Sequence, residues 1–181
     1  MSRKLIASLF CVILSTALAI PAQTGQEVSA RAAQRIEKEV RHEILMLPYY
    51  DVFENITYKV EGYNVALMGQ VTRPTLKKDA ENVVKGVEGV EKVVNQIEVL
   101  PVSLMDDQLR LALFRAIYGY SALERYAMPV IKPIRIIVKN GNATLEGVVD
   151  SETDKNTVDI RAKSVSGVFS VTNNLRVVKS K

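Results

Sequence analysis

The chain has 181 residues, a formal net charge of +4, a single histidine and a single cysteine. So few thiols and imidazoles exclude a disulfide framework and disfavour a zinc site, because both need several such side chains. The modest positive charge either favours anionic partners such as lipid head groups or belongs to an ordinary surface of mixed charge.

Residues 1–22 are predicted to be a secretory signal peptide. A basic pair precedes an apolar run over residues 5–20, and Ala17-Leu18-Ala19 fits a cleavage site. The run is short for a membrane span, which takes roughly 20 residues, although an uncleaved anchor is the alternative. We therefore expect a periplasmic or otherwise exported protein. Its mature chain would lack Cys11 and any transmembrane span.

The first folded unit follows a polar lead-in at residues 23–30, which we expect to be mobile. A helix is predicted over residues 34–47, because apolar residues recur at i, i+4, i+8 and i+11 and a proline follows. Strands at residues 56–60 and 65–71 flank a tight turn at Glu61-Gly62. The remaining predicted elements are a helix that starts at Pro74 and a strand over residues 90–99.

The second unit repeats this order after a short connector at residues 101–104. A helix is predicted over residues 109–120, with Asp106 as its N-cap. Asn140-Gly141 suits the positive φ angles of a two-residue hairpin turn. The elements after this helix are strands at residues 134–138 and 143–149, a helix capped by Ser151 and Asp154, and a strand at residues 168–177.

The two units share their sequence at a constant offset of 78 residues, so that Gly147 echoes Gly69. A duplicated unit determines the domain count and the fold together. We therefore predict an α+β protein of two tandem α-β-β-α-β domains, residues 31–101 and 104–179. Each domain would have a three-stranded sheet covered by two helices. Further pairs at this offset are Gly89 with Gly167, Val93 with Val171, and Asn95 with Asn173.

Each unit carries two short glycine motifs. They are Leu67-Met68-Gly69-Gln70-Val71 with Gly89-Val90-Glu91-Lys92-Val93-Val94-Asn95, and Leu145-Glu146-Gly147-Val148-Val149 with Gly167-Val168-Phe169-Ser170-Val171-Thr172-Asn173. These motifs resemble the BON domain of bacterial osmotically inducible periplasmic proteins and of proteins tied to outer-membrane maintenance. The resemblance implies phospholipid or envelope association and no catalysis. A role in osmotic or envelope stress rests on the resemblance alone.

Little in either unit resembles a reactive centre. His42 lies on the polar side of its predicted helix without convergent partners. The acidic residues lack the spacing of a calcium loop. Gly86-Val87-Glu88-Gly89 is a GxxG sequence, but its middle residues are not basic as in loops that clamp nucleic acid. We therefore predict no catalytic residue, no metal, no cofactor and no nucleic-acid partner.

The first helix of the second unit is predicted to have two apolar faces. The face expected to fill the core comprises Leu109, Leu113, Ala116 and Tyr120. The opposite face is the candidate binding site, and it comprises Leu111, Phe114 and Tyr118 with Arg110 and Arg115 at its border. An exposed apolar face with a basic rim suits an anionic phospholipid surface or an envelope protein. The alternative is that this face docks against the other unit.

The charge is shared unevenly between the units. Residues 23–103 carry 10 basic and 12 acidic side chains, whereas residues 104–181 carry 12 basic and 8 acidic ones. The cationic second unit is the better match for anionic lipid. We therefore expect a non-enzymatic envelope protein that binds phospholipid surfaces or envelope partners. The alternative is a soluble periplasmic chaperone-like or structural module that binds proteins.

Overall fold

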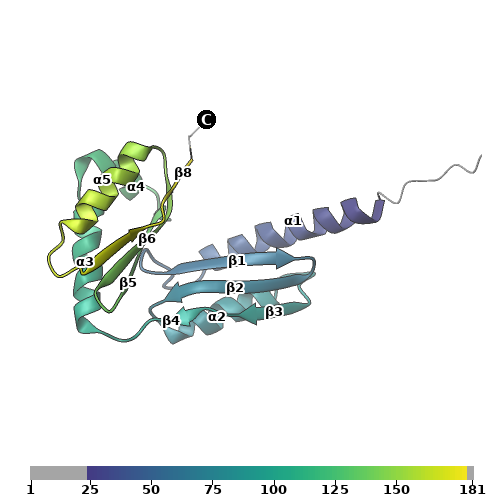
Figure 1. Cartoon of the computed structure of the whole chain (residues 1–181). Coiled ribbons are helices and arrows are strands. Elements are labelled where there is room, and N and C mark those ends of the chain that lie inside the picture. The colour runs from purple at the N-terminus through teal and green to yellow at the C-terminus, as the bar shows by residue number, and fades with distance from the viewer. Residues whose placement is uncertain (1–23, 179–181) are drawn as a thin grey trace, which may run out of the picture.

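The computed structural model describes residues 24–178 and contains two tandem α+β domains (Figure 1). Residues 1–22, the predicted signal peptide, lie outside the described residues. The predicted α-β-β-α-β order is confirmed in both domains. Domain 1 comprises α1 (Thr24–Leu45), β1 (Asn55–Glu61), β2 (Asn64–Val71), α2 (Pro74–Lys85), β3 (Lys92–Asn95) and β4 (Glu98–Val99). Domain 2 comprises α3 (Leu104–Tyr118), η1 (Ser121–Leu123), α4 (Glu124–Ala127), β5 (Ile134–Lys139), β6 (Asn142–Val149), α5 (Glu152–Lys163), β7 (Ser170–Asn173) and β8 (Arg176–Val177).

Each sheet has its second strand at the centre. β2 pairs antiparallel with β1 and parallel with β3 and β4. In domain 2, β6 pairs antiparallel with β5 and parallel with β7 and β8. The last strand, predicted to run unbroken over residues 90–99, is split by Asn95. The Asn95 side chain accepts a hydrogen bond from Ile97 N at 3.1 Å and donates one to Lys77 O at 2.8 Å. Asn173 makes both contacts at the matching positions of domain 2.

The strands of the two domains match at the predicted offset of 78. Gly69 and Gly147 have φ angles of +107° and +119°, which L side chains rarely adopt. A Cβ at either position would lie 1.9 Å from a carbonyl oxygen, that of Asn55 in domain 1 and of Pro133 in domain 2. Both glycines are therefore required by the same close approach of backbone to backbone.

The first helices match at a different offset. The stripe Ile36, Val40 and Ile44 of α1 corresponds to Leu109, Leu113 and Ile117 of α3, an offset of 73, and all six side chains are buried. Gly89 lies against the Ile36 side chain and Gly167 against that of Leu109, which supports this match. Domain 2 thus holds five extra residues between its first helix and first strand (78 − 73 = 5), where η1 and α4 lie.

α1 is longer than predicted. It begins at Thr24 instead of residue 34, so most of the predicted lead-in at residues 23–30 is part of this helix; its mobility stays a prediction. The physical reason is that extending an existing helix costs much less than nucleating a new one. Figure 1 shows α1 reaching past the end of the domain 1 sheet.

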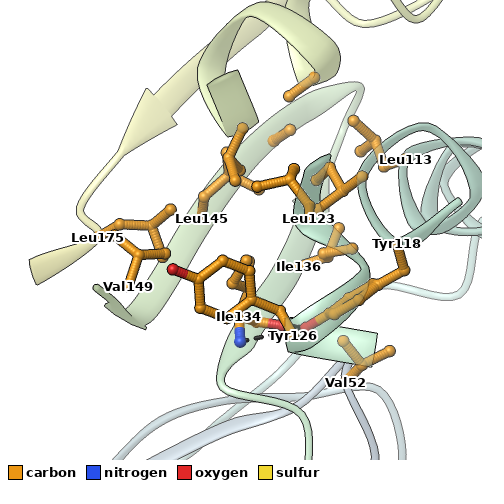
Figure 2. Close-up of a cluster of buried hydrophobic side chains, with 14 of the residues drawn as sticks. Val52, Leu113, Tyr118, Leu123, Tyr126, Ile134, Ile136, Leu145, Val149 and Leu175 are labelled. Carbon is orange, nitrogen blue, oxygen red and sulfur yellow. Dashed lines mark hydrogen bonds between the residues drawn. The ribbon is translucent and has the colours of Figure 1, made fainter. Parts of the chain in front are cut away.

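A short segment before β1, residues 50–54, joins the two domains, and we call it the linking segment. Val52 belongs to the buried core cluster of domain 2, and Figure 2 shows it among those side chains. Its carbonyl oxygen accepts a hydrogen bond from Ile136 N, an N–H of β5, at 2.8 Å. The Arg135 guanidinium donates to Asp51 O at 2.7 Å. Domain 1 therefore completes the core of domain 2.

The outer face of β5 also lies against domain 1. Ile137 is buried, and it lines a cavity of about 290 Å³ together with Leu100 of domain 1. An ion pair of 2.5 Å joins Lys139 Nζ to Glu98 Oε1 across the same boundary. Because β5 is buried on both faces, its sequence is a nearly continuous apolar run, as expected for such a strand.

Candidate functional site

The start of α3 is fixed by two polar side chains. Ser103 is the N-cap, and its hydroxyl accepts a hydrogen bond from Asp106 N at 3.2 Å, so the prediction of Asp106 as the cap is wrong. Asp106 lies one turn further on and is buried. Its carboxylate accepts the N–H groups of Asn140 and Gly141, both at 2.8 Å. Asp106 therefore ties α3 to the β5–β6 turn, which needs those donors paired.

Arg110 does not border an exposed face. Its side chain is 4% exposed, so its predicted place on a solvent-facing rim is wrong. The guanidinium donates to Val138 O at 2.7 Å and to Asp107 Oδ1 at 2.5 Å, while Nε has no partner among the described residues. Arg110 follows Asp106 by one helical turn, which places both beside the buried stripe of α3.

Tyr118 is also buried, at 7% exposure, and its predicted outward orientation is wrong. Its hydroxyl donates to Ile134 O at 2.6 Å and accepts from Ile134 N at 3.1 Å (Figure 2). This pair of bonds satisfies both backbone groups at the start of β5. Burial raises the pKa of Tyr118 above its ordinary value.

Phe114 lies at the seam between the domains. Its half-buried ring packs edge-on against Phe53 of the linking segment, with 6.3 Å between centroids, and against Tyr118 at 5.0 Å. The core face of α3 includes Ile117, which was not predicted there. Of the predicted core positions, Ala116 is half-buried and Tyr120 is exposed. The buried stripe is thus rotated about the helix axis from the predicted one.

Of the five predicted site residues, Leu111 and Arg115 remain exposed. Leu111 belongs to a larger set of exposed apolar side chains that surrounds the start of α3, which we call the apolar ridge. On α3, Leu104 and Leu111 are seven residues apart, and Arg115 follows four residues later, so the three share one helix face. The apolar ridge comprises Val102, Leu104, Met105 and Leu111.

A groove of about 390 Å³ runs beside the apolar ridge. Val102 and Leu111 line it on one side, and Arg73 of domain 1 lines it on the other. The Arg73 guanidinium lies over the exposed ring of Tyr49, 4.7 Å from its centroid. The residues around this groove come from both domains, so the periodicity of α3 alone predicts only Arg110 and Leu111 among them. The sequence signal for the rest of the apolar ridge is the apolar residues Val102, Leu104 and Met105, which follow Pro101 in and just after the connector.

The acidic and histidine side chains of the described residues do not form a reactive cluster. His42 is exposed on α1, and no three potential metal ligands gather between residues 24 and 178. Asp154 is the most connected acid. Burial raises its pKa, but hydrogen bonds from Ser151, Tyr126 and Arg125 outweigh that effect and lower it. All three bonds end on Oδ2, and they join the start of α5 to α4.

Within the same part of the chain, no helix has the length and apolar character needed to cross a bilayer. The family model described as BON domain matches residues 32–101 and 121–179. No curated protein matches the chain significantly.

Two solved structures are similar to the chain at 12% sequence identity. One is of CdsD, a structural protein of the type III secretion system of Chlamydia trachomatis, with 81% of this chain and 93% of that chain covered and a TM-score of 0.33. The other is the C-terminal domain of CdsD, with 78% and 96% covered and a TM-score of 0.27.

Proposed function

The chain belongs to the BON domain family, and on that premise we propose that it is an exported protein that binds anionic phospholipid surfaces of the cell envelope. The family is generally non-enzymatic and associated with the envelope. The observation that carries the proposal is the apolar ridge around the start of α3. Its four side chains are all exposed, and two of them, Val102 and Leu111, line the groove between the two domains.

The chemistry of the apolar ridge suits the boundary between head groups and acyl chains. Leu104 is 81% exposed and Met105 lies beside it on the first turn of α3. Apolar side chains at such a boundary gain free energy by leaving water, at about 25 cal/mol per Å² of apolar surface buried. A contiguous exposed apolar patch on a folded protein commonly marks an interaction site.

Cationic and aromatic groups flank the apolar ridge. Arg73 lines the same groove, and Arg115 follows Leu111 by one turn of α3. Arginine binds phosphate oxygens, and each basic residue near an anionic surface contributes about 1 kcal/mol. Tyr49, held under Arg73, supplies an aromatic ring of the kind found at membrane interfaces. The carboxylate of Asp107 also lines the groove, where Arg110 neutralises it.

The test is vesicle co-sedimentation of a variant with Leu104→Glu and Leu111→Glu. We expect the unaltered protein to bind phosphatidylglycerol vesicles and to bind phosphatidylcholine vesicles more weakly. The double variant should lose more than tenfold in affinity for phosphatidylglycerol, because two apolar contacts are replaced by two charges of the lipid's own sign. Both positions are exposed, so the melting temperature should hardly change.

The matched control is Ile160→Glu with Phe169→Glu, which alters two exposed apolar side chains outside the apolar ridge. It adds the same charge and should leave vesicle binding within about threefold of the unaltered protein, because salt screens the repulsion between distant added charges and the lipid. Equal losses in both double variants would refute the apolar ridge as the lipid contact. Absence of vesicle binding by the unaltered protein would favour the protein-binding alternative.

A further inference from the structure

Domain 2 carries its own copy of the linking segment at residues 128–132, and among the described residues that copy completes the core of no other domain. Counted back from the matching residues Asn55 and Pro133, Val52 corresponds to Val130. Val52 is 1% exposed in the core of domain 2, whereas Val130 is 98% exposed. Ile131, which corresponds to Phe53, is exposed as well. Residues that complete a neighbouring domain in one repeat are thus left in solvent in the other.

The same contrast appears at the far end of each sheet. Leu100 N donates to Val71 O at 2.8 Å, and Val178 N donates to Val149 O at 2.9 Å, so these positions are equivalent. Leu100 is 2% exposed and faces the cavity between the domains, whereas Val178 is 55% exposed. Val52 and Leu100 of domain 1 are therefore buried against domain 2, whereas the matching residues of domain 2, Val130 and Val178, are apolar and exposed.

The two residues that form the ion pair across the domain boundary each have a matching residue of opposite charge in the other domain. Lys139 and Glu98 form this pair in the structure at 2.5 Å. At the offset of 78, Lys139 corresponds to Glu61 on β1, and Glu98 corresponds to Arg176 on β8. An Arg176 side chain of one molecule could therefore meet Glu61 of another with attraction, as Glu98 meets Lys139 within one molecule.

The acceptor surface in domain 1 is the outer edge of β1. β2 is the one strand that pairs with β1 among the described residues, and no strand lies along the other edge of β1, where Ile56 N donates to the Tyr50 hydroxyl at 3.5 Å. Tyr58 occupies the position of Ile136, whose N–H receives the linking segment in domain 2. Tyr58 and Leu45, which matches Tyr118, are both half-buried and offer apolar surface beside that edge. The corresponding edge in domain 2 is already occupied by the molecule's own Val52.

We propose that the protein associates head to tail, with domain 2 of one molecule docking on the β1 edge of domain 1 of a second copy. The contact repeats the one between the domains of a single chain, with Val130, Ile131 and Val178 as its apolar residues and Arg176 paired with Glu61. The two surfaces differ, so the association is heterologous and extends to a ring or a filament. The net charges of −2 and +4 on the two halves favour this order over contacts between like domains.

The intermolecular contact is weaker than the one within the chain. Lys59 on β1 stands where Ile137 stands on β5, and its ammonium is paired with Glu61 at 2.6 Å. An exposed ammonium contributes less apolar burial than an isoleucine, and the partner must also be captured from solution. We therefore expect reversible association that rises with protein concentration and falls with added salt.

The experiment measures mass by sedimentation equilibrium in lipid-free buffer. The unaltered protein should show an average mass that rises with concentration, and Val130→Asp should hold it at one chain. Val102→Asp is the matched control, because Val102 is equally exposed and lies outside the proposed contact. It should leave the association unchanged. A single-chain mass for the unaltered protein at every concentration would overturn the proposal.

Charge reversal tests the direction of the contact. Glu61→Arg and Arg176→Glu should each abolish association, and the variant that carries both should regain it. Mixing Val130→Asp with Glu61→Arg should give dimers and nothing larger, since each has one intact surface. Circular dichroism melts verify that all of these exposed substitutions leave the fold intact. If the doubly reversed variant stays at one chain, the Glu61–Arg176 contact and the proposed docking are wrong.

Discussion

Domain 1 buries one charged side chain among the described residues, Glu54, whereas domain 2 buries four. The two domains nevertheless share strand register, turn positions and the glycines that the sheet requires. The buried charged residues of domain 2 are Asp106, Arg110, Arg135 and Asp154. Of these four residues, Arg135 donates a hydrogen bond to domain 1, whereas Asp106 and Asp154 are hydrogen-bonded within domain 2.

These charged residues have specific partners instead of solvent. Asp106 holds the β5–β6 turn, Arg110 holds Val138 O, and Arg135 holds Asp51 O of the linking segment. Arg135 also lies over the ring of Tyr50, 4.6 Å from its centroid. A duplicated domain can therefore keep its backbone while one copy acquires buried polar contacts of its own, one of which, from Arg135 to Asp51 O, also joins the two domains.

The largest expected effect lies at the seam that distinguishes the two domains. Phe114→Asp removes the contacts with Phe53 and Tyr118 and places a carboxylate in an apolar site. We expect a loss of about 3 kcal/mol in the free energy of unfolding, measured by urea titration. Small-angle scattering should also show a larger radius of gyration, because the seam loosens. Leu111→Asp, three residues earlier and exposed, should change stability by about 0.5 kcal/mol or less.

A smaller effect is expected from the buried polar residues of α3. Arg110→Met keeps most of the apolar stem and leaves Val138 O without its donor, at a cost of about 2 kcal/mol. Arg115→Met, on the exposed side of the same helix, should cost less than about 0.5 kcal/mol. Thermal unfolding of the two variants compares them directly. Equal stability of the two variants would mean that the Arg110 guanidinium adds nothing to the free energy of unfolding beyond what the apolar part of its side chain contributes.

The sequence predicts the elements of both domains because their signals are local. The Asn140-Gly141 turn, the Ser151 cap and the glycine at Gly147 each depend on nearby backbone geometry. The buried stripe of α3 was within reach too. Leu109, Leu113 and Ile117 repeat the spacing of Ile36, Val40 and Ile44 in α1, and this comparison predicts Ile117 in the core in place of Ala116. The exposure of Tyr120 does not follow from it, because the matching Leu47 is buried.

The contacts between the domains were not predictable in the same way. Nothing in the sequence around Val52 shows that a loop residue of domain 1 completes the core of domain 2. Arg110 looks like a surface residue because its burial depends on Val138 O, a backbone atom 28 positions away. Leu111 was correctly expected to be exposed, but its neighbours Val102 and Arg73 come from segments that only the tertiary fold brings together.

The smallest expected effect concerns pH and the one buried charge of domain 1. Glu54 lies in the linking segment, where its carboxylate accepts hydrogen bonds from Thr72 Oγ1 at 2.5 Å and from Asp51 N at 3.1 Å. Burial raises its pKa, against the lowering effect of these bonds, and the nearby charge of Asp51 raises it further. The folded state therefore favours the protonated form, so its contribution to stability is full below the unfolded pKa and is lost as pH rises through the folded pKa.

Glu54→Gln removes that loss, because the amide is neutral at every pH. We expect the variant to exceed the unaltered protein in unfolding free energy at pH 7, by less than about 1 kcal/mol, and to match it near pH 4. Lys132→Gln at the corresponding position of domain 2 is the control and should show no such crossover, because it removes no carboxylate. Urea titrations at the two pH values measure the difference. A Gln variant that is less stable at pH 7 would show that the ionised carboxylate, through its two hydrogen bonds, holds the linking segment in place more strongly than burial opposes it.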